Sequence, residues 1–129
     1  MPKRALPRPT DSELQILRVF WQRGPSTVRQ VLDELEPHRP SGYTTVLKLL
    51  QIMTDKGLVQ RDESDRSHVY RASLTEEQTQ RQLVKDLLDR AFGGSAQKLV
   101  LQALAAKKTS SEELAQIRKV LDEFAGGAS

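Results

Sequence analysis

The chain lacks cysteine and has only two histidines, His38 and His68. Without cysteine it has no disulfide framework and no thiolate chemistry, and two histidines make a poor transition-metal site. No HExxH, GxSxG or glycine-rich phosphate motif appears. No apolar run approaches the roughly 20 residues that cross a bilayer, and no signal-peptide apolar region opens the chain. We therefore expect a cytoplasmic protein without membrane insertion, cofactor, metal or catalytic activity.

The bulk composition is that of a globular protein with an uneven charge. The chain has 129 residues, of which 37% are hydrophobic and 29% charged, and its net charge is +3. Residues 1–73 hold 12 Lys and Arg against 9 Asp and Glu, whereas residues 74–129 hold 8 of each. The excess of positive charge in the first part is compatible with a nucleic-acid surface there, although many domains that bind no nucleic acid match it.

Residues 44–56 predict an amphipathic helix. Apolar residues recur at i, i+3, i+4 and i+7, which are Val46, Leu49, Leu50 and Met53. The opposite face carries polar residues, which are Thr44, Lys48, Gln51 and Asp55. Gly57 follows as the residue that ends the helix in the left-handed conformation.

A charged hairpin follows this helix. Leu58 and Val59 begin one strand, residues 63–66 supply turn chemistry, and His68 begins the return strand. The alternation places Val69 on one face and His68 and Tyr70 on the other, which allows a ring to pack inward.

Two further helices are predicted before residue 44. The first begins near Thr10, which has capping-box spacing with Glu13, and the second begins at Ser26 or Thr27. Their apolar stripes are Leu14, Leu17, Phe20 and Trp21 in the first helix, and Val28, Val31, Leu32 and Leu35 in the second. This order predicts a winged helix–turn–helix domain over residues 10–73, preceded by a flexible basic arm at residues 1–9.

Residues 74–125 predict three more helices, and residues 126–129 a tail. Capping boxes occur at Thr75 and at Ser110, and Gly93 with Gly94 separates the first two of these helices. So short a segment rarely buries a core of its own, so we expect a homodimer. The expected interface residues are Leu87, Leu88, Leu99, Leu104, Ile117, Val120, Leu121 and Phe124. The alternative is that these helices fold back on residues 10–72. The fold class is mainly α with a small β-hairpin (α+β).

The candidate DNA-binding residues lie on the third helix and the hairpin. Thr44 and Thr45 offer short hydroxyls and methyl groups, and Lys48 reaches guanine or the backbone. Tyr43 either clamps a phosphate or packs on the second helix. The hairpin carries Arg61, Arg66, Ser67, His68 and Arg71, with Arg66 at its tip the best phosphate or minor-groove candidate. The alternatives are a plain amphipathic helix with a solvated face and a solvated turn.

The function therefore has two candidate classes. The first is a sequence-specific DNA-binding repressor. The second is a winged-helix module that binds another protein, which the small net charge and the carboxylate of Asp55 favour.

The chain resembles the BlaI/MecI penicillinase-repressor family over nearly its whole length. The resemblance is carried by residues 10–17 with Trp21, residues 27–31, residues 43–46, residues 56–59 and residues 69–70. It implies a dimeric winged-helix repressor that binds a palindromic operator. It also places Thr44, Thr45, Leu47 and Lys48 where the family reads DNA, and Arg66 on the wing.

The resemblance further implies a route of inactivation. Members that control β-lactamase genes are cleaved in the C-terminal part when a membrane metalloprotease-type sensor is triggered. The matching bond here is Gln102–Ala103, where the best-known members have Asn and Phe. Ile52 and Asp55 also stand where relatives often have basic residues. The copper-sensing branch has a cysteine-rich C-terminus, so that route is excluded here.

Overall fold

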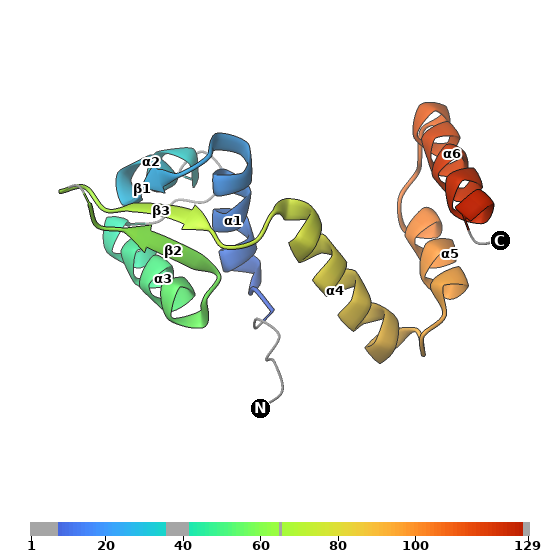
Figure 1. Ribbon diagram of the computed structural model, residues 1–129, viewed down its shortest axis with the longest axis horizontal. Coiled ribbons are helices and arrows are strands. Elements are labelled where there is room, and N and C mark those ends of the chain that lie inside the picture. The colour runs from blue at the N-terminus through green and yellow to red at the C-terminus, as the bar shows by residue number, and fades with distance from the viewer. Residues whose placement is uncertain (1–7, 36–41, 65, 128–129) are drawn as a thin grey trace. The chain divides into compact units, whose positions relative to one another are not determined.

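The computed structural model describes residues 8–35, 42–64 and 66–127 (Figure 1). These residues form six helices and three short strands, which confirms the expected mainly helical winged helix–turn–helix fold. In chain order they are α1 (Asp11–Arg23), β1 (Ser26–Thr27), α2 (Val28–Leu35), α3 (Tyr43–Lys56), β2 (Val59–Asp62), β3 (Val69–Ala72), α4 (Glu76–Ala91), α5 (Ala96–Ala106) and α6 (Ser111–Gly127). Residues 1–7 of the predicted basic arm lie outside the described residues.

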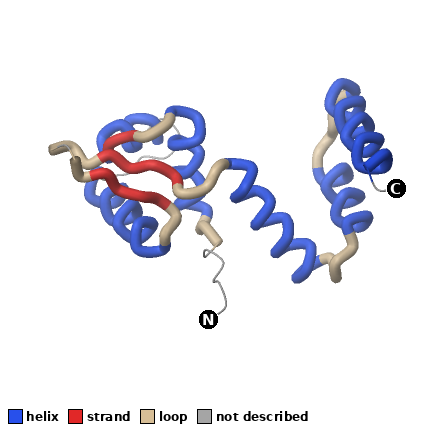
Figure 2. The backbone as a smooth tube through the Cα atoms, in the orientation of Figure 1, coloured by secondary structure: helices blue, strands red, loops and turns tan. Residues whose placement is uncertain are grey.

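The three strands form one antiparallel sheet in the order β1-β3-β2. Figure 2 shows them in red with β3 in the middle. Strand β1 corrects our prediction, because Ser26 and Thr27 were expected to begin a helix, whereas they pair with Tyr70 and Val69. The helix begins one residue later, and Thr27 caps it through reciprocal hydrogen bonds with Gln30. The capping interaction involves residues three positions apart, whereas β1 forms only because it pairs with β3, which is distant in the sequence.

The hydrophobic core lies between the sheet and the first three helices. Three residues of the predicted inner face of α3 are fully buried, since Val46, Leu50 and Met53 are all 0% exposed, while the fourth, Leu49, is partly buried against the core. Gly57 ends α3 with φ +85°, in the left-handed conformation that was expected. In α1 the buried stripe is shifted from the prediction. Ile16 and Val19 are buried, while Leu14 and Trp21, which we expected inside, are only partly buried.

The chain divides into two compact units, Met1–Leu83 and Val84–Ser129. We had expected the change near residue 74. The start of α4 belongs to the first unit because Thr79 is buried and the Trp21 indole Nε1 donates a hydrogen bond of 3.0 Å to the Leu74 carbonyl.

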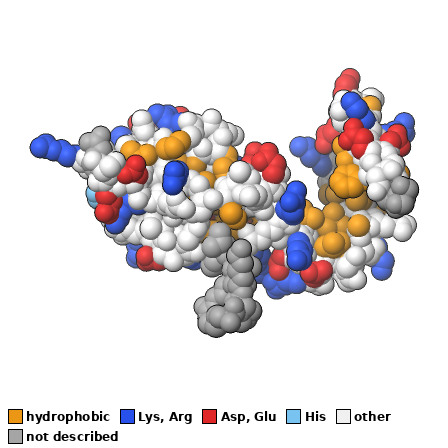
Figure 3. All heavy atoms as spheres, viewed as in Figure 1, with side chains coloured by type: hydrophobic (Ala, Val, Ile, Leu, Met, Phe, Trp, Pro, Cys, Tyr) orange, Lys and Arg blue, Asp and Glu red, His pale blue; other side chains and the backbone are white. Residues whose placement is uncertain are grey.

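The second unit leaves its apolar side chains exposed. No residue of α5 or α6 is buried within the described chain, and Phe124 is 75% exposed. Hydrophobic side chains at the surface of these helices are visible in Figure 3. Helix α6 continues through Gly126 and Gly127, where we expected a tail, because glycine weakens a helical turn without forbidding it. None of the helices within the described residues is both long and apolar enough to span a bilayer.

Glu13 connects the beginning of α1 to the end of α3. Its carboxylate accepts the Thr10 N–H at 2.8 Å, which completes the predicted capping box, and its two oxygens accept from Lys56 Nζ at 3.1 and 2.9 Å. The residue is only 1% exposed. Burial by itself would raise the pKa of Glu13. The hydrogen bonds from Thr10 and Lys56 and the charge of Lys56 outweigh it, so the pKa lies below its ordinary value of 4.5.

We expect Glu13→Gln to lower the free energy of unfolding by about 2 kcal/mol at pH 7, because it removes a charge-assisted contact with Lys56. A carboxyl whose folded-state pKa is depressed stabilises the fold above its unfolded pKa and loses this effect as pH falls through the folded value. The difference between wild type and Glu13→Gln in urea unfolding should therefore shrink below about pH 4.5. The exposed Asp33→Asn is the control and should change stability little at either pH. A difference that is independent of pH would contradict this account.

Candidate nucleic-acid interface

The N-terminus of α3 is open at the surface. Gly42 is its N-cap in an extended conformation, and no side chain of the described residues caps it. The first helical residues, Tyr43, Thr44 and Thr45, are exposed. The free N–H groups of a first helical turn favour an anion, so this end of α3 suits a phosphate.

The polar face of α3 is exposed along its length. Thr44, Lys48, Gln51 and Asp55 are all exposed, as the periodicity predicted. Leu47 is partly buried and packs against the edge of the core. Asp55 lies about 16 Å along the helix from Thr44, at 1.5 Å per residue. The acidic residue therefore sits at the opposite end of α3 from the threonines.

A hollow of about 290 Å³ joins the first turns of α3 to the wing, which is the β2–β3 hairpin. It is lined by residues of β1, the start of α2, α3 and the wing, which are Thr27, Val28, Arg29, Tyr43, Leu47, Arg66, Ser67, His68 and Tyr70. Five of the residues singled out from the sequence thus meet in one place, namely Tyr43, Leu47, Arg66, Ser67 and His68. Thr44, Thr45 and Lys48 belong to the exposed surface of α3 and do not line the hollow.

Arg29 is a member of this group that the sequence did not single out. Its guanidinium lies 5.4 Å from the centre of the Tyr43 ring, a cation–π contact between α2 and α3. Tyr43 therefore contacts the second helix, one of its two predicted roles, and remains 44% exposed. The sequence feature that could have indicated Arg29 is a basic residue in the first turn of α2, two positions after its capping residue Thr27. Its distance from Tyr43 depends on how α2 and α3 pack.

Arg61 and Arg71 each have a partner within the wing. Arg61 stands opposite Tyr70 in the strand register and forms an ion pair with Glu63. A hydrogen bond with Tyr70, more than the Glu63 charge, raises the pKa of Arg61 despite some desolvation. Arg71 donates to Gln60 Oε1 at 3.1 and 2.7 Å. Arg61 also lines a separate hollow with Pro25, so it does not join the Tyr43 group.

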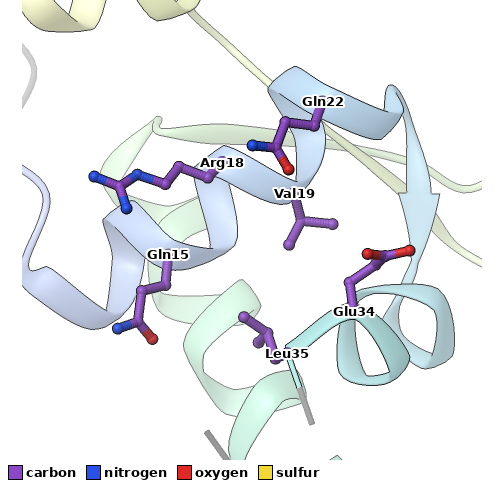
Figure 4. Close-up of a pocket in the computed structure, with 6 residues that line it drawn as sticks. All are labelled: Gln15, Arg18, Val19, Gln22, Glu34 and Leu35. Atoms are coloured by element: carbon purple, nitrogen blue, oxygen red, sulfur yellow. The ribbon is translucent and has the colours of Figure 1, made fainter. Parts of the chain in front are cut away.

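Another hollow, of about 330 Å³, lies between α1 and α2 (Figure 4). It is lined by Gln15, Arg18, Val19, Gln22, Glu34 and Leu35. Glu34 accepts a hydrogen bond of 3.1 Å from Arg23, so its charge is partly compensated. None of the residues predicted to bind DNA lines this hollow.

Comparison with known proteins identifies relatives along almost the entire chain. The model of the penicillinase repressor family matches residues 9–123. The transcriptional regulator BlaI of Mycobacterium tuberculosis is 30% identical over 123 residues, which cover 95% of this chain and 88% of that protein. A penicillinase repressor of Bacillus licheniformis is 24% identical over 118 residues, which cover 92% of each chain.

Solved structures support the fold. The solution structure of B. licheniformis BlaI in complex with the blaP half-operator matches with a TM-score of 0.50 and 23% identity, covering 57% of this chain and 89% of that one. RosR of H. salinarum matches with a TM-score of 0.51 and 17% identity, covering 92% and 94%. At these identities the likeness shows a shared architecture.

Proposed function

Because the chain belongs to the penicillinase repressor family, whose named relatives are transcriptional regulators and not enzymes, we propose that it is a repressor that binds a palindromic DNA operator as a homodimer. The observation that carries this proposal is the meeting of the open end of α3 with the wing tip around one hollow. The B. licheniformis relative is described in complex with a half-operator, which supports DNA as the partner. Because a transcriptional repressor acts on DNA inside the cell, the proposal includes a cytoplasmic location.

In this proposal α3 enters the major groove and the wing contacts the adjacent backbone. Thr44, Thr45 and Lys48 face the base edges, because they occupy the exposed face near the open end of α3. Tyr43 and Leu47 flank them beside the hollow. Arg66 and Ser67 contact phosphates from the wing. We expect Arg61 to contribute less to DNA binding, because it already interacts with Tyr70 and Glu63.

We expect Lys48→Ala and Arg66→Ala each to weaken DNA binding by removing one phosphate or base contact. The plot of log binding constant against log salt should lose about one unit of slope for each phosphate contact removed. Lys107→Ala, in the exposed connection after α5, is the matched control and should leave the slope unchanged. The measurement is fluorescence anisotropy with a duplex selected from a random library.

An unchanged slope in both variants would remove these residues from the interface. A wild-type protein that fails to retain random duplex DNA even at low salt would contradict the repressor and favour the protein-interaction module.

The homodimer is proposed from the exposed apolar faces of residues 74–125. Leu87, Val120, Leu121 and Phe124 are exposed in the single chain, and the other expected interface residues are only partly buried, namely Leu88, Leu99, Leu104 and Ile117. Apolar faces of this kind mark an interaction surface. A second copy of the same chain offers the complementary face, and two copies present two α3 helices to a palindrome.

Leu121→Asp or Phe124→Asp should dissociate the dimer, because each would bury an unpaired carboxylate at a cost of several kcal/mol. Sedimentation equilibrium at micromolar concentration should show a dimer for the wild type and a monomer for either variant. Ala115→Asp places the same charge on the opposite side of α6 and should remain dimeric. A monomeric wild type would overturn the prediction.

The family's inactivation by proteolysis supplies the last part of the proposal. Gln102 and Ala103 are exposed and lie within α5, where no side chain is buried in the single chain. A helix with so few contacts opens locally at little cost, which suits a protease acting downstream of a membrane sensor. Cleavage there would separate α6 from the DNA-binding domain.

A chain that ends at Gln102 should therefore bind one half-site as the full chain does. We expect its affinity for the complete palindrome to fall roughly 100-fold or more, because linked half-site binding is lost. Anisotropy titrations with both duplexes would measure this. Equal affinity of the truncated and full chains for the palindrome would exclude inactivation by cleavage at this bond.

A further inference from the structure

Within the first unit, a hydrogen bond joins α1 to the short segment between β3 and α4. Trp21, on α1, donates its indole N–H to the carbonyl of Leu74 at 3.0 Å, across 53 positions of sequence. Its ring is partly buried and packs against the core. An indole N–H can only donate a hydrogen bond, and when it is buried it usually finds an acceptor. Here the acceptor is the Leu74 carbonyl, which holds the ring in one orientation.

Two further contacts hold the same short segment. The Ser73 N–H donates to the Leu58 carbonyl at 3.0 Å, directly after β3. The side chain of Thr79, one turn into α4, is 4% exposed, although every other residue of α4 is at least partly exposed. Residues 73–79 are therefore held within the first unit at three successive points. The helix that begins there continues as far as Ala91, beyond the end of that unit at Leu83.

We propose that Trp21 is a positioning residue that sets the direction in which α4 leaves the DNA-binding domain and so selects the spacing of the two half-sites. This inference depends on the proposed dimeric repressor. A dimer reads two half-sites at a spacing fixed by the path of chain between its recognition helices and its interface. Residues 73–79 are the first part of that path, and Trp21 supplies the side-chain hydrogen bond that restrains it.

The first test measures the restraint in the free protein. Trp21→Phe keeps an aromatic ring against the core and removes the N–H. We expect amide hydrogen exchange at Gln78 and Thr79 to become about fivefold faster, as the loss of one hydrogen bond implies. Exchange within α2 and α3 should be unchanged. Leu14→Val, which trims another half-buried α1 side chain of the same core, is the control and should leave residues 78–79 as in the wild type.

The second test measures the function. The probes are a palindrome that the wild type selects from random DNA, the same duplex with two base pairs inserted at its centre, and a single half-site. Trp21→Phe should bind the half-site as the wild type does, while its preference for the native spacing should fall about fivefold. Thr79→Glu places a charge at the buried position of α4 and should loosen the same segment. It should therefore also reduce the preference for the native spacing. It should also shift the emission of Trp21, the only tryptophan, to longer wavelength.

Each outcome has a distinct meaning. Unchanged exchange at residues 78–79 in Trp21→Phe, or faster exchange with an unchanged spacing preference, would overturn the role of Trp21 and leave the repressor intact. A wild type that binds the palindrome no more tightly than the half-site would overturn the dimeric repressor and this inference together. A wild type that prefers the palindrome to the half-site but binds both spacings equally would overturn this inference alone. If Trp21→Phe lowers the affinity for the half-site as much as the affinity for the palindrome, Trp21 contributes only to the stability of the domain and the proposal is wrong.

Discussion

The buried carboxylate of Glu13 is the contact on which the placement of α3 depends. It caps α1 through Thr10 and holds the end of α3 through Lys56, so one side chain fixes two helices to each other. At the other end of α3, Arg29 of α2 lies over Tyr43. Because both ends are held and the middle is packed into the core, the exposed face of α3 is presented as a rigid surface. A surface that reads base edges needs this rigidity, since hydrogen-bond readout fails when donors move by an ångström.

The two units of the chain differ in how much of their apolar surface is buried. The first closes a core around the sheet, whereas helices α5 and α6 keep every side chain at least partly exposed. If the proposed dimer forms, the second unit would consequently be the part whose stability depends on the partner copy. A repressor arranged in this way can be released from DNA without unfolding the domain that contacts it.

The DNA-binding domain has a small excess of positive charge, which limits how strongly it can attract phosphates. The net charge is only +3, Lys56 is paired with Glu13, and Arg61 and Arg71 are held within the wing. These three cations are therefore less available for phosphates, which lowers what each can contribute to counterion release. In the proposed dimer, two linked copies would bind the two half-sites more tightly than one copy binds one, which would make the connection between the units as important as the contacts with DNA.

Local patterns in the sequence were enough to determine the helices, their caps and the inner face of α3. Thr10 with Glu13, Thr75 with Gln78 and the left-handed Gly57 all follow from interactions within a few residues. Tyr43, Arg66 and Ser67 of the candidate site were likewise identifiable, because an amphipathic helix followed by a charged hairpin is a local signature, whereas Leu47 was indicated only by the family resemblance. The pairing of β1 with β3, the contact between Arg29 and Tyr43, the partner of Glu13 and the acceptor of the Trp21 N–H were decided only by the tertiary structure. Each joins residues at least 14 positions apart, up to 53 for Trp21, and no periodicity or spacing encodes which distant groups packing will bring together.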